Sequence, residues 1–103
     1  MSFLKPWMLS WTNPADMSDV KNIRVRFSET PFTGTAADYA LPYAEVGLVT
    51  SVALPLPNTP AFNGNINIGI STVDAVGNES DMDIVTAPFD TVAPPPVTGA
   101  KLA

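Results

Sequence analysis

The chain has 103 residues, of which 46% are hydrophobic and 15% charged, so it can form one packed domain but is too short for two ordinary ones. A net charge of −5 with only five basic residues argues against nucleic acid as a partner, because phosphate binding needs clustered Lys and Arg. Since Cys and His are both absent, disulfides, thiolate metal sites and the usual nucleophile–base pairs are excluded, and neither an enzyme nor a cofactor is expected.

The composition disfavours helices along the whole chain. Eleven prolines and six glycines interrupt it, and no window of a dozen residues keeps an apolar pattern at helical spacing without one of them. No run reaches the roughly 18–20 apolar residues of a membrane helix. The first ten residues also lack the basic start of a signal peptide. An all-β protein without membrane insertion is therefore predicted.

The first predicted strand covers residues 7–11 and ends before Pro14. Trp7, Leu9 and Trp11 alternate with smaller or more flexible residues, so they share one face. Two tryptophans on an exposed face would suit a sugar-stacking platform. Their alternation with a leucine favours burial in the core instead.

The second predicted strand covers residues 20–28. Its inner face is formed by Ile23, Val25 and Phe27. Lys21, Arg24 and Arg26 lie close together and could bind an anionic partner. We favour outward charges that keep the sheet soluble, with Glu45 or aspartates opposite as partners.

The middle of the chain is less regular. Residues 32–45 hold Gly and Pro, with a short edge strand possible at 38–41, and residues 46–56 are rich in β-formers up to Pro55. Residues 57–65 read as a loop. Three aromatic residues of the irregular regions are candidates for an exposed contact surface: Tyr39, Tyr43 and Phe62.

A further strand is predicted over residues 66–74, where three isoleucines alternate with small polar residues. A Gly-Asn turn at 77–78 follows, because both residues accept positive φ. The chain then returns over 81–87, with Met82 and Ile84 as expected core residues. Strands at this spacing predict an antiparallel sandwich of six to seven strands, with a barrel as the other closed arrangement.

Four acidic residues gather around this turn: Asp74, Glu79, Asp81 and Asp83. Carboxylates and loop carbonyls suit Ca²⁺, so a weak calcium site is one interpretation. The spacing does not fit the EF-hand pattern, and a solvated acidic turn is the interpretation we favour. No metal is therefore expected.

Several motifs resemble the fibronectin type III family in its bacterial or phage form, an immunoglobulin-like sandwich. Residues 9–14, L-S-W-T-N-P, resemble the second strand of that family, and residues 23–27 resemble the third. Residues 73–80 resemble the end of the sixth strand and its turn into the seventh, and residues 90–99 resemble the junction between tandem copies. The family's Leu-x-Pro…Tyr corner is absent or rebuilt, since Ile66 takes the position of the tyrosine.

The resemblance also implies a first strand that residues 1–6 do not supply, while a similar sequence stands at 95–100. A cut between tandem domains, a tail that folds back on its own domain, and a tail that completes a neighbouring subunit all remain open. The third alternative would be strand addition across a head-to-tail contact.

Residues 1–88 are therefore assigned to the sandwich, and residues 89–103 to a proline-rich linker with a possible extra or donated strand. The expected function is a structural or interaction module that contacts another domain or a second copy, as in a surface protein, a filament or a phage particle. The alternative is a spacer or sugar-binding domain of a secreted carbohydrate-active enzyme. An extracellular, cell-surface or virion location is favoured over the cytoplasm. The expected contact residues are Pro94, Pro95, Pro96, Val97, Thr98, Gly99 and Leu102.

Overall fold

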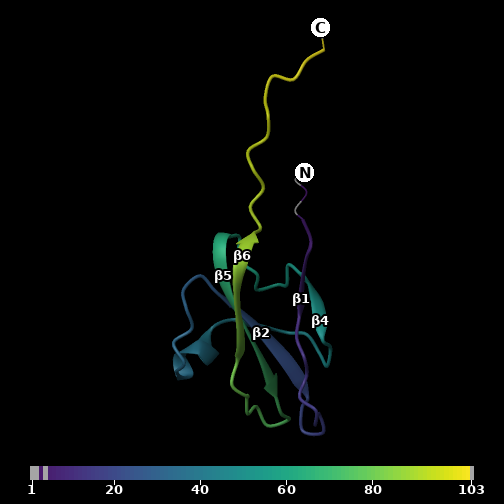
Figure 1. Cartoon of the computed structure of the whole chain (residues 1–103), viewed down its shortest axis with the longest axis vertical. Helices are drawn as coiled ribbons and strands as arrows, with labels where there is room; N and C mark the ends of the chain where they lie inside the picture. The colour runs from purple at the N-terminus through teal and green to yellow at the C-terminus, as the bar shows by residue number, and fades with distance from the viewer. Residues whose placement is uncertain (1–2, 4, 103) are drawn as a thin grey trace.

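The computed structural model describes residue 3 and residues 5–102, and it has two antiparallel sheets (Figure 1). Within these residues the elements are β1 (Trp7–Ser10), β2 (Asn22–Ser28), the 3-10 helix η1 (Ala36–Ala40), β3 (Tyr43–Glu45), β4 (Ser51–Leu54), β5 (Asn63–Val73) and β6 (Asp83–Asp90). These elements confirm the predicted all-β sandwich. Within the described part of the chain, no helix has the length and apolar character to cross a membrane.

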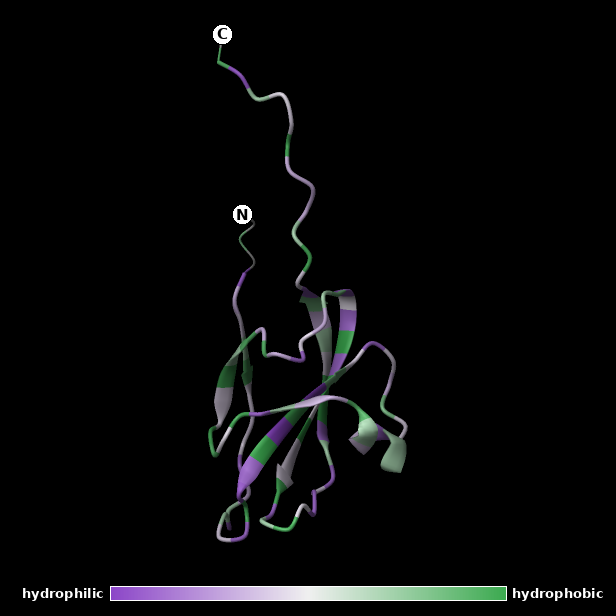
Figure 2. Cartoon of the chain, turned by 180° about the vertical axis from the view of Figure 1, so that it is seen from behind, coloured by the Kyte–Doolittle hydropathy of each residue, from purple (hydrophilic) through white to green (hydrophobic). Residues whose placement is uncertain are grey.

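The larger sheet has the strand order β3-β2-β5-β6. Its centre is β5, which pairs with β2 from Asn67 to Val73 and with β6 from Asn63 to Ile70. The alternation of apolar and polar residues predicted for these strands is visible along β2 in Figure 2. Because side chains alternate between the faces of a strand, one face of this sheet is apolar and lies toward β1 and β4.

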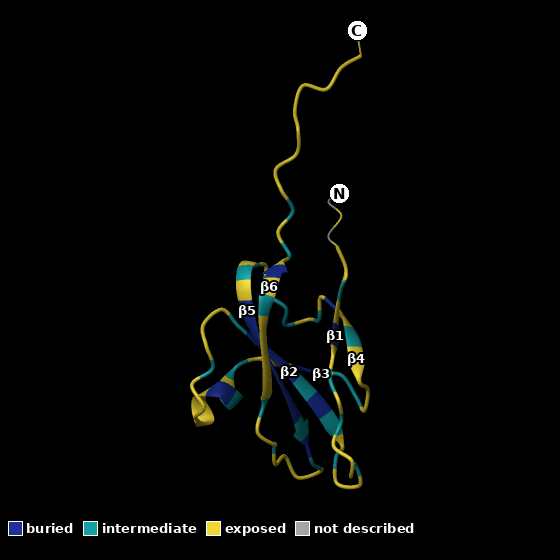
Figure 3. Ribbon diagram, in the orientation of Figure 1, coloured by how far each residue is buried: buried dark blue, intermediate teal, exposed yellow. Residues whose placement is uncertain are grey.

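The smaller sheet consists of β1 and β4, which pair from Trp7↔Leu54 to Ser10↔Ser51. The core lies between the two sheets. Its buried members are Leu9, Ile23, Val25, Phe27, Leu54, Ile66, Ile68, Ile70 and Phe89. Figure 3 shows this burial concentrated in the strands, whereas the C-terminal tail is exposed over most of its length.

Two sequence predictions about the strands are wrong. Residues 38–41 form no edge strand, because η1 occupies Ala36–Ala40. Ile84 is 48% exposed, and the core residue of β6 is Phe89. The register explains this error: Val85 and Ala87 stand opposite the buried Ile68 and Ile66 of β5, so they and Phe89 lie on the inward face of β6.

Candidate functional site

Asp74 organises the turn between β5 and β6. Its Oδ1 accepts hydrogen bonds from the backbone N–H groups of Val76 (3.0 Å) and Asn78 (2.9 Å), and its Oδ2 accepts one from the Asn78 side chain (2.9 Å). These bonds, the Asn78 side chain first among them, lower the pKa of Asp74. Gly77 has φ 94°, as the predicted turn requires. The Asp74 carboxylate therefore stabilises the turn through hydrogen bonds within it.

Glu79 points back across the larger sheet and holds two arginines. Its carboxylate lies 2.6 Å from Nη1 of Arg24 and 2.8 Å from Nη1 of Arg26, and it accepts a hydrogen bond of 2.7 Å from Ser71 Oγ. Burial alone would oppose ionisation. The hydrogen bonds from Arg26, Ser71 and Arg24 outweigh it and lower the pKa of Glu79 to about 2.

The four predicted acidic residues therefore do not converge on one point. Asp74 serves its own turn, Glu79 serves the arginines, and Asp81 and Asp83 are exposed. Among the described residues, no group of three or more carboxylates is placed to hold a metal ion.

Arg26 overturns the expectation that the arginines of β2 face solvent, because it is only 1% exposed. Its guanidinium donates to the carbonyl oxygens of Leu41 (3.2 Å) and Tyr39 (3.1 Å) as well as to Glu79. It also stacks near the rings of Tyr39 and Tyr43. The segment around η1 thus covers the outer face of β2, and this cluster is structural. Arg24 does contact Glu45, as expected, at 3.2 Å.

The aromatic candidates are mostly committed to packing. Trp7 and Trp11 are packed against the core, and the indole N–H of Trp11 donates to Asn13 at 2.9 Å. Phe62 also packs against the core, so it is no exposed contact residue, whereas Tyr43 is 43% exposed. This arrangement gives no flat aromatic platform for a sugar at the two tryptophans.

The C-terminal tail, defined as residues 91–102, leaves the body at the end of β6 and extends away from it (Figure 1). Its base is fixed, because Thr91 donates its N–H to Phe62 (2.9 Å) and its hydroxyl to Pro60 (2.8 Å). Residues 94–102 are all exposed, with Val97 at 88% and Leu102 at 101%. No strand forms at 97–102, so the predicted contact residues lie free of the body.

A groove opens between the two sheets where β1 faces β6. It has a volume of about 150 Å³, and its lining is mainly apolar. The residues that line it are Trp7, Met8, Leu9, Leu54, Ile66, Ile68, Val85, Ala87, Pro88 and Phe89. Val85 faces inward with its neighbours on β6 but is 41% exposed, because β1 does not reach over it. We call this feature the β1–β6 groove.

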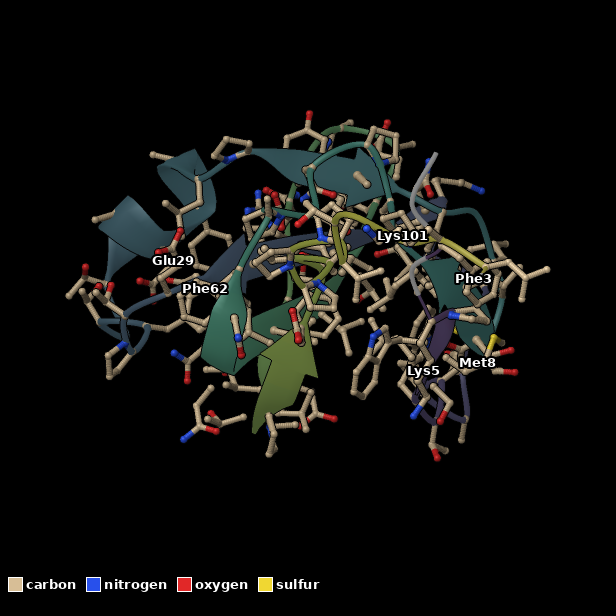
Figure 4. The ribbon with its side chains drawn as sticks, turned by 90° about the horizontal axis from the view of Figure 1, so that it is seen from above. Phe3, Lys5, Met8, Glu29, Phe62 and Lys101 are labelled. Carbon is tan, nitrogen blue, oxygen red and sulfur yellow. The ribbon has the colours of Figure 1, made fainter. Side chains whose placement is uncertain are left out.

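One edge of β1 borders the β1–β6 groove. Among the described residues, β1 pairs only with β4, so the backbone groups on its other edge are open to an added strand. The indole Nε1 of Trp7 is buried and has no hydrogen-bond partner there. Seen from above, Lys5 and Met8 lie on this side of the molecule, opposite Glu29 (Figure 4).

Comparisons of the chain with protein-family models, with curated proteins and with solved structures give no match. The sequence does not predict the groove, because the expected inward residues, Met82 just before β6 and Ile84 within it, lie on the face that points away from the core. The signal was present in Val85, Ala87 and Phe89, whose alternation continues past the predicted end of the strand.

Proposed function

We propose that this chain is a non-catalytic structural and interaction module, and that its C-terminal tail contacts or completes a neighbouring domain or subunit. One observation carries the proposal: residues 94–102 extend from the body with Val97 and Leu102 almost fully exposed. Exposed apolar side chains on an extended segment favour association, because burying them on a partner removes apolar surface from water.

The same proposal includes a fibronectin type III-like fold. It is supported by the two antiparallel sheets, by the presence of residues 9–10 and 23–27 in strands, and by the turn within residues 73–80. A repeat of a surface protein and a subunit of a filament or phage particle both belong to this class of function. In each, the module acts by joining protein to protein.

The test is the mass of the purified chain in solution, measured by light scattering over a range of concentrations. We expect the full chain to form species larger than a monomer, and a chain that lacks residues 94–103 to be monomeric. Circular dichroism of the shortened chain should be that of a folded β protein, because residues 94–102 contribute no strand. An unchanged mass after the deletion would contradict the proposal.

A further inference from the structure

We propose that the β1–β6 groove receives residues 97–102 from a second copy of this chain, which add to the open edge of β1 as an antiparallel strand. This inference rests on the proposed function, because it names the surface and the partner that the tail uses. The segment becomes a third strand of the smaller sheet and covers the core where Val85 is now exposed.

The size and chemistry of the groove suit one strand with an aliphatic side chain. A dry apolar cavity of about 150 Å³ holds a molecule the size of benzene. The β1–β6 groove has this volume and an apolar lining, so a leucine side chain fits within it. The open edge of β1 offers backbone N–H and C=O groups for pairing.

The direction of the tail indicates a second copy rather than the chain's own groove. β1 starts at the end of the body where β6 finishes, so the tail runs away from its own β1 (Figure 1). To reach its own groove it would have to reverse and then lie parallel to β1. The anchored Thr91 and three consecutive prolines at 94–96 oppose such a reversal, since proline-rich segments stay extended.

A second copy placed beyond the end of the tail presents its β1 in the direction that antiparallel pairing with the tail requires. If that copy has the same orientation, the tail arrives at the end of its body that is remote from its own tail and runs antiparallel to its β1, because β1 and β6 run in opposite directions within one chain (Figure 1). Residues 91–96 then form a spacer of about 19 Å, and residues 97–102 span about 20 Å of paired strand. Four paired residues of β1 are within that length.

The tail has two unlike faces. Alternation places Thr98, Ala100 and Leu102 on one side of an extended segment and Val97, Gly99 and Lys101 on the other. Leu102 is therefore the apolar anchor for the groove, and Val97 can contact only the rim of the partner. The face with the leucine enters the groove and leaves the lysine in water. Gly99 has φ 69°, and a glycine moves to the extended region without a steric penalty.

Charge also favours this partner. Lys101 is the only charged residue of the tail, and all ten acidic residues of the chain lie in the body up to Asp90. The tail, with its single positive charge, is therefore attracted to a body of net negative charge. Because Lys5 Nζ lies 4.6 Å from the centre of the Trp7 ring beside the groove, this attraction comes from the body as a whole and not from the groove lining. Because the tail and the groove are different surfaces, the contact is heterologous, and copies that keep the same orientation continue as an open filament.

The first experiment blocks the groove in the full chain. Val85→Glu places a carboxylate in the apolar groove, and the matched control Ile84→Glu places one on the opposite face of the same strand, where the side chain is already 48% exposed. We expect light scattering to show loss of assembly with Val85→Glu and parent-like assembly with Ile84→Glu. Assembly that survives Val85→Glu, or that is lost equally in both variants, overturns the groove assignment.

The second experiment separates a blocked groove from a damaged fold. Val85→Glu keeps its tail, and the chain lacking 94–103 keeps its groove, so mixing the two should give a complex of one copy of each and nothing longer. Two monomers that stay monomeric on mixing overturn the inference.

These outcomes distinguish the two proposals. If deletion of the tail abolishes assembly but Val85→Glu does not, the proposed function stands and the groove is wrong. If deletion of the tail leaves the mass unchanged, both are wrong.

Discussion

At the scale of single residues, Glu79 predicts how stability depends on pH. Its pKa is about 2 in the folded chain against an ordinary value of 4.5, because Arg26, Ser71 and Arg24 donate to it. A carboxyl with a lowered pKa stabilises the fold above its unfolded pKa, and that contribution is lost as the pH falls toward the folded value. The stabilisation is about 3 kcal/mol by linkage, present at pH 7 and lost between roughly pH 5 and pH 2.

The variant Glu79→Gln tests this. It leaves two arginines without their shared carboxylate, so we expect a loss of about 3–5 kcal/mol at pH 7 in urea unfolding. The decline in stability between pH 5 and pH 2 should also become shallower, though Asp38 and Asp74, whose pKa values are also lowered, keep some of it. Glu29→Gln, on an exposed loop, is the control and should match the parent. A Glu79→Gln chain with the parent's pH dependence would contradict the assignment.

At the scale of elements, Gly69 allows the side chains of Met82 and Phe32 to pack closely on β5. A Cβ at this position would lie 2.7 Å from Met82 Sδ and 3.1 Å from Phe32 Cζ. The absence of a side chain therefore lets both residues pack on the outer face of the larger sheet. Met82, predicted as a residue of the core between the sheets, belongs to this outer layer.

We expect Gly69→Val to destabilise the fold by about 1–3 kcal/mol, because the added methyl groups overfill this contact. Met82→Ala removes the side chain that the valine would meet, so Gly69→Val should lower the free energy of unfolding by less in that background than in the parent. Urea unfolding of the parent, both single variants and the double variant gives the coupling energy. Strictly additive effects would show that Met82 is not what the valine meets.

The sequence predicts a strand and its buried face where apolar and polar residues alternate and the apolar ones enter the core. Ile23, Val25 and Phe27 in β2, and the three isoleucines of β5, are buried as their spacing indicates. Arg26 could not be predicted, because alternation says which face a residue takes but not that η1 and its flanking segments will cover that face. The wall of the groove formed by β6 can be predicted from the alternation of Val85, Ala87 and Phe89, but the placement of β1 opposite it depends on the order of strands in space, which no local pattern contains.

At the scale of the whole molecule, the extended C-terminal tail makes the radius of gyration larger than that of a compact chain. The Cα radius of gyration is 17.0 Å, whereas a compact chain of this length has about 13 Å. The Val85→Glu variant, which is expected to be monomeric, allows the tail to be measured alone by small-angle X-ray scattering. We expect a radius that falls by several ångströms when residues 94–103 are also removed. A radius that is compact before the deletion would indicate a tail folded back on its own body.

The direction of the tail also has a mechanical consequence. The molecule is 66 Å along its longest axis, and both the tail and the strands that it leaves and joins lie roughly along that axis. In a string of joined copies, a pull on the two ends passes from β6 of one copy through its tail and into β1 of the next. Because the force acts along the paired strands, it shears all their hydrogen bonds together instead of opening them one by one. Each junction would thus resist tension far better than its few paired residues suggest.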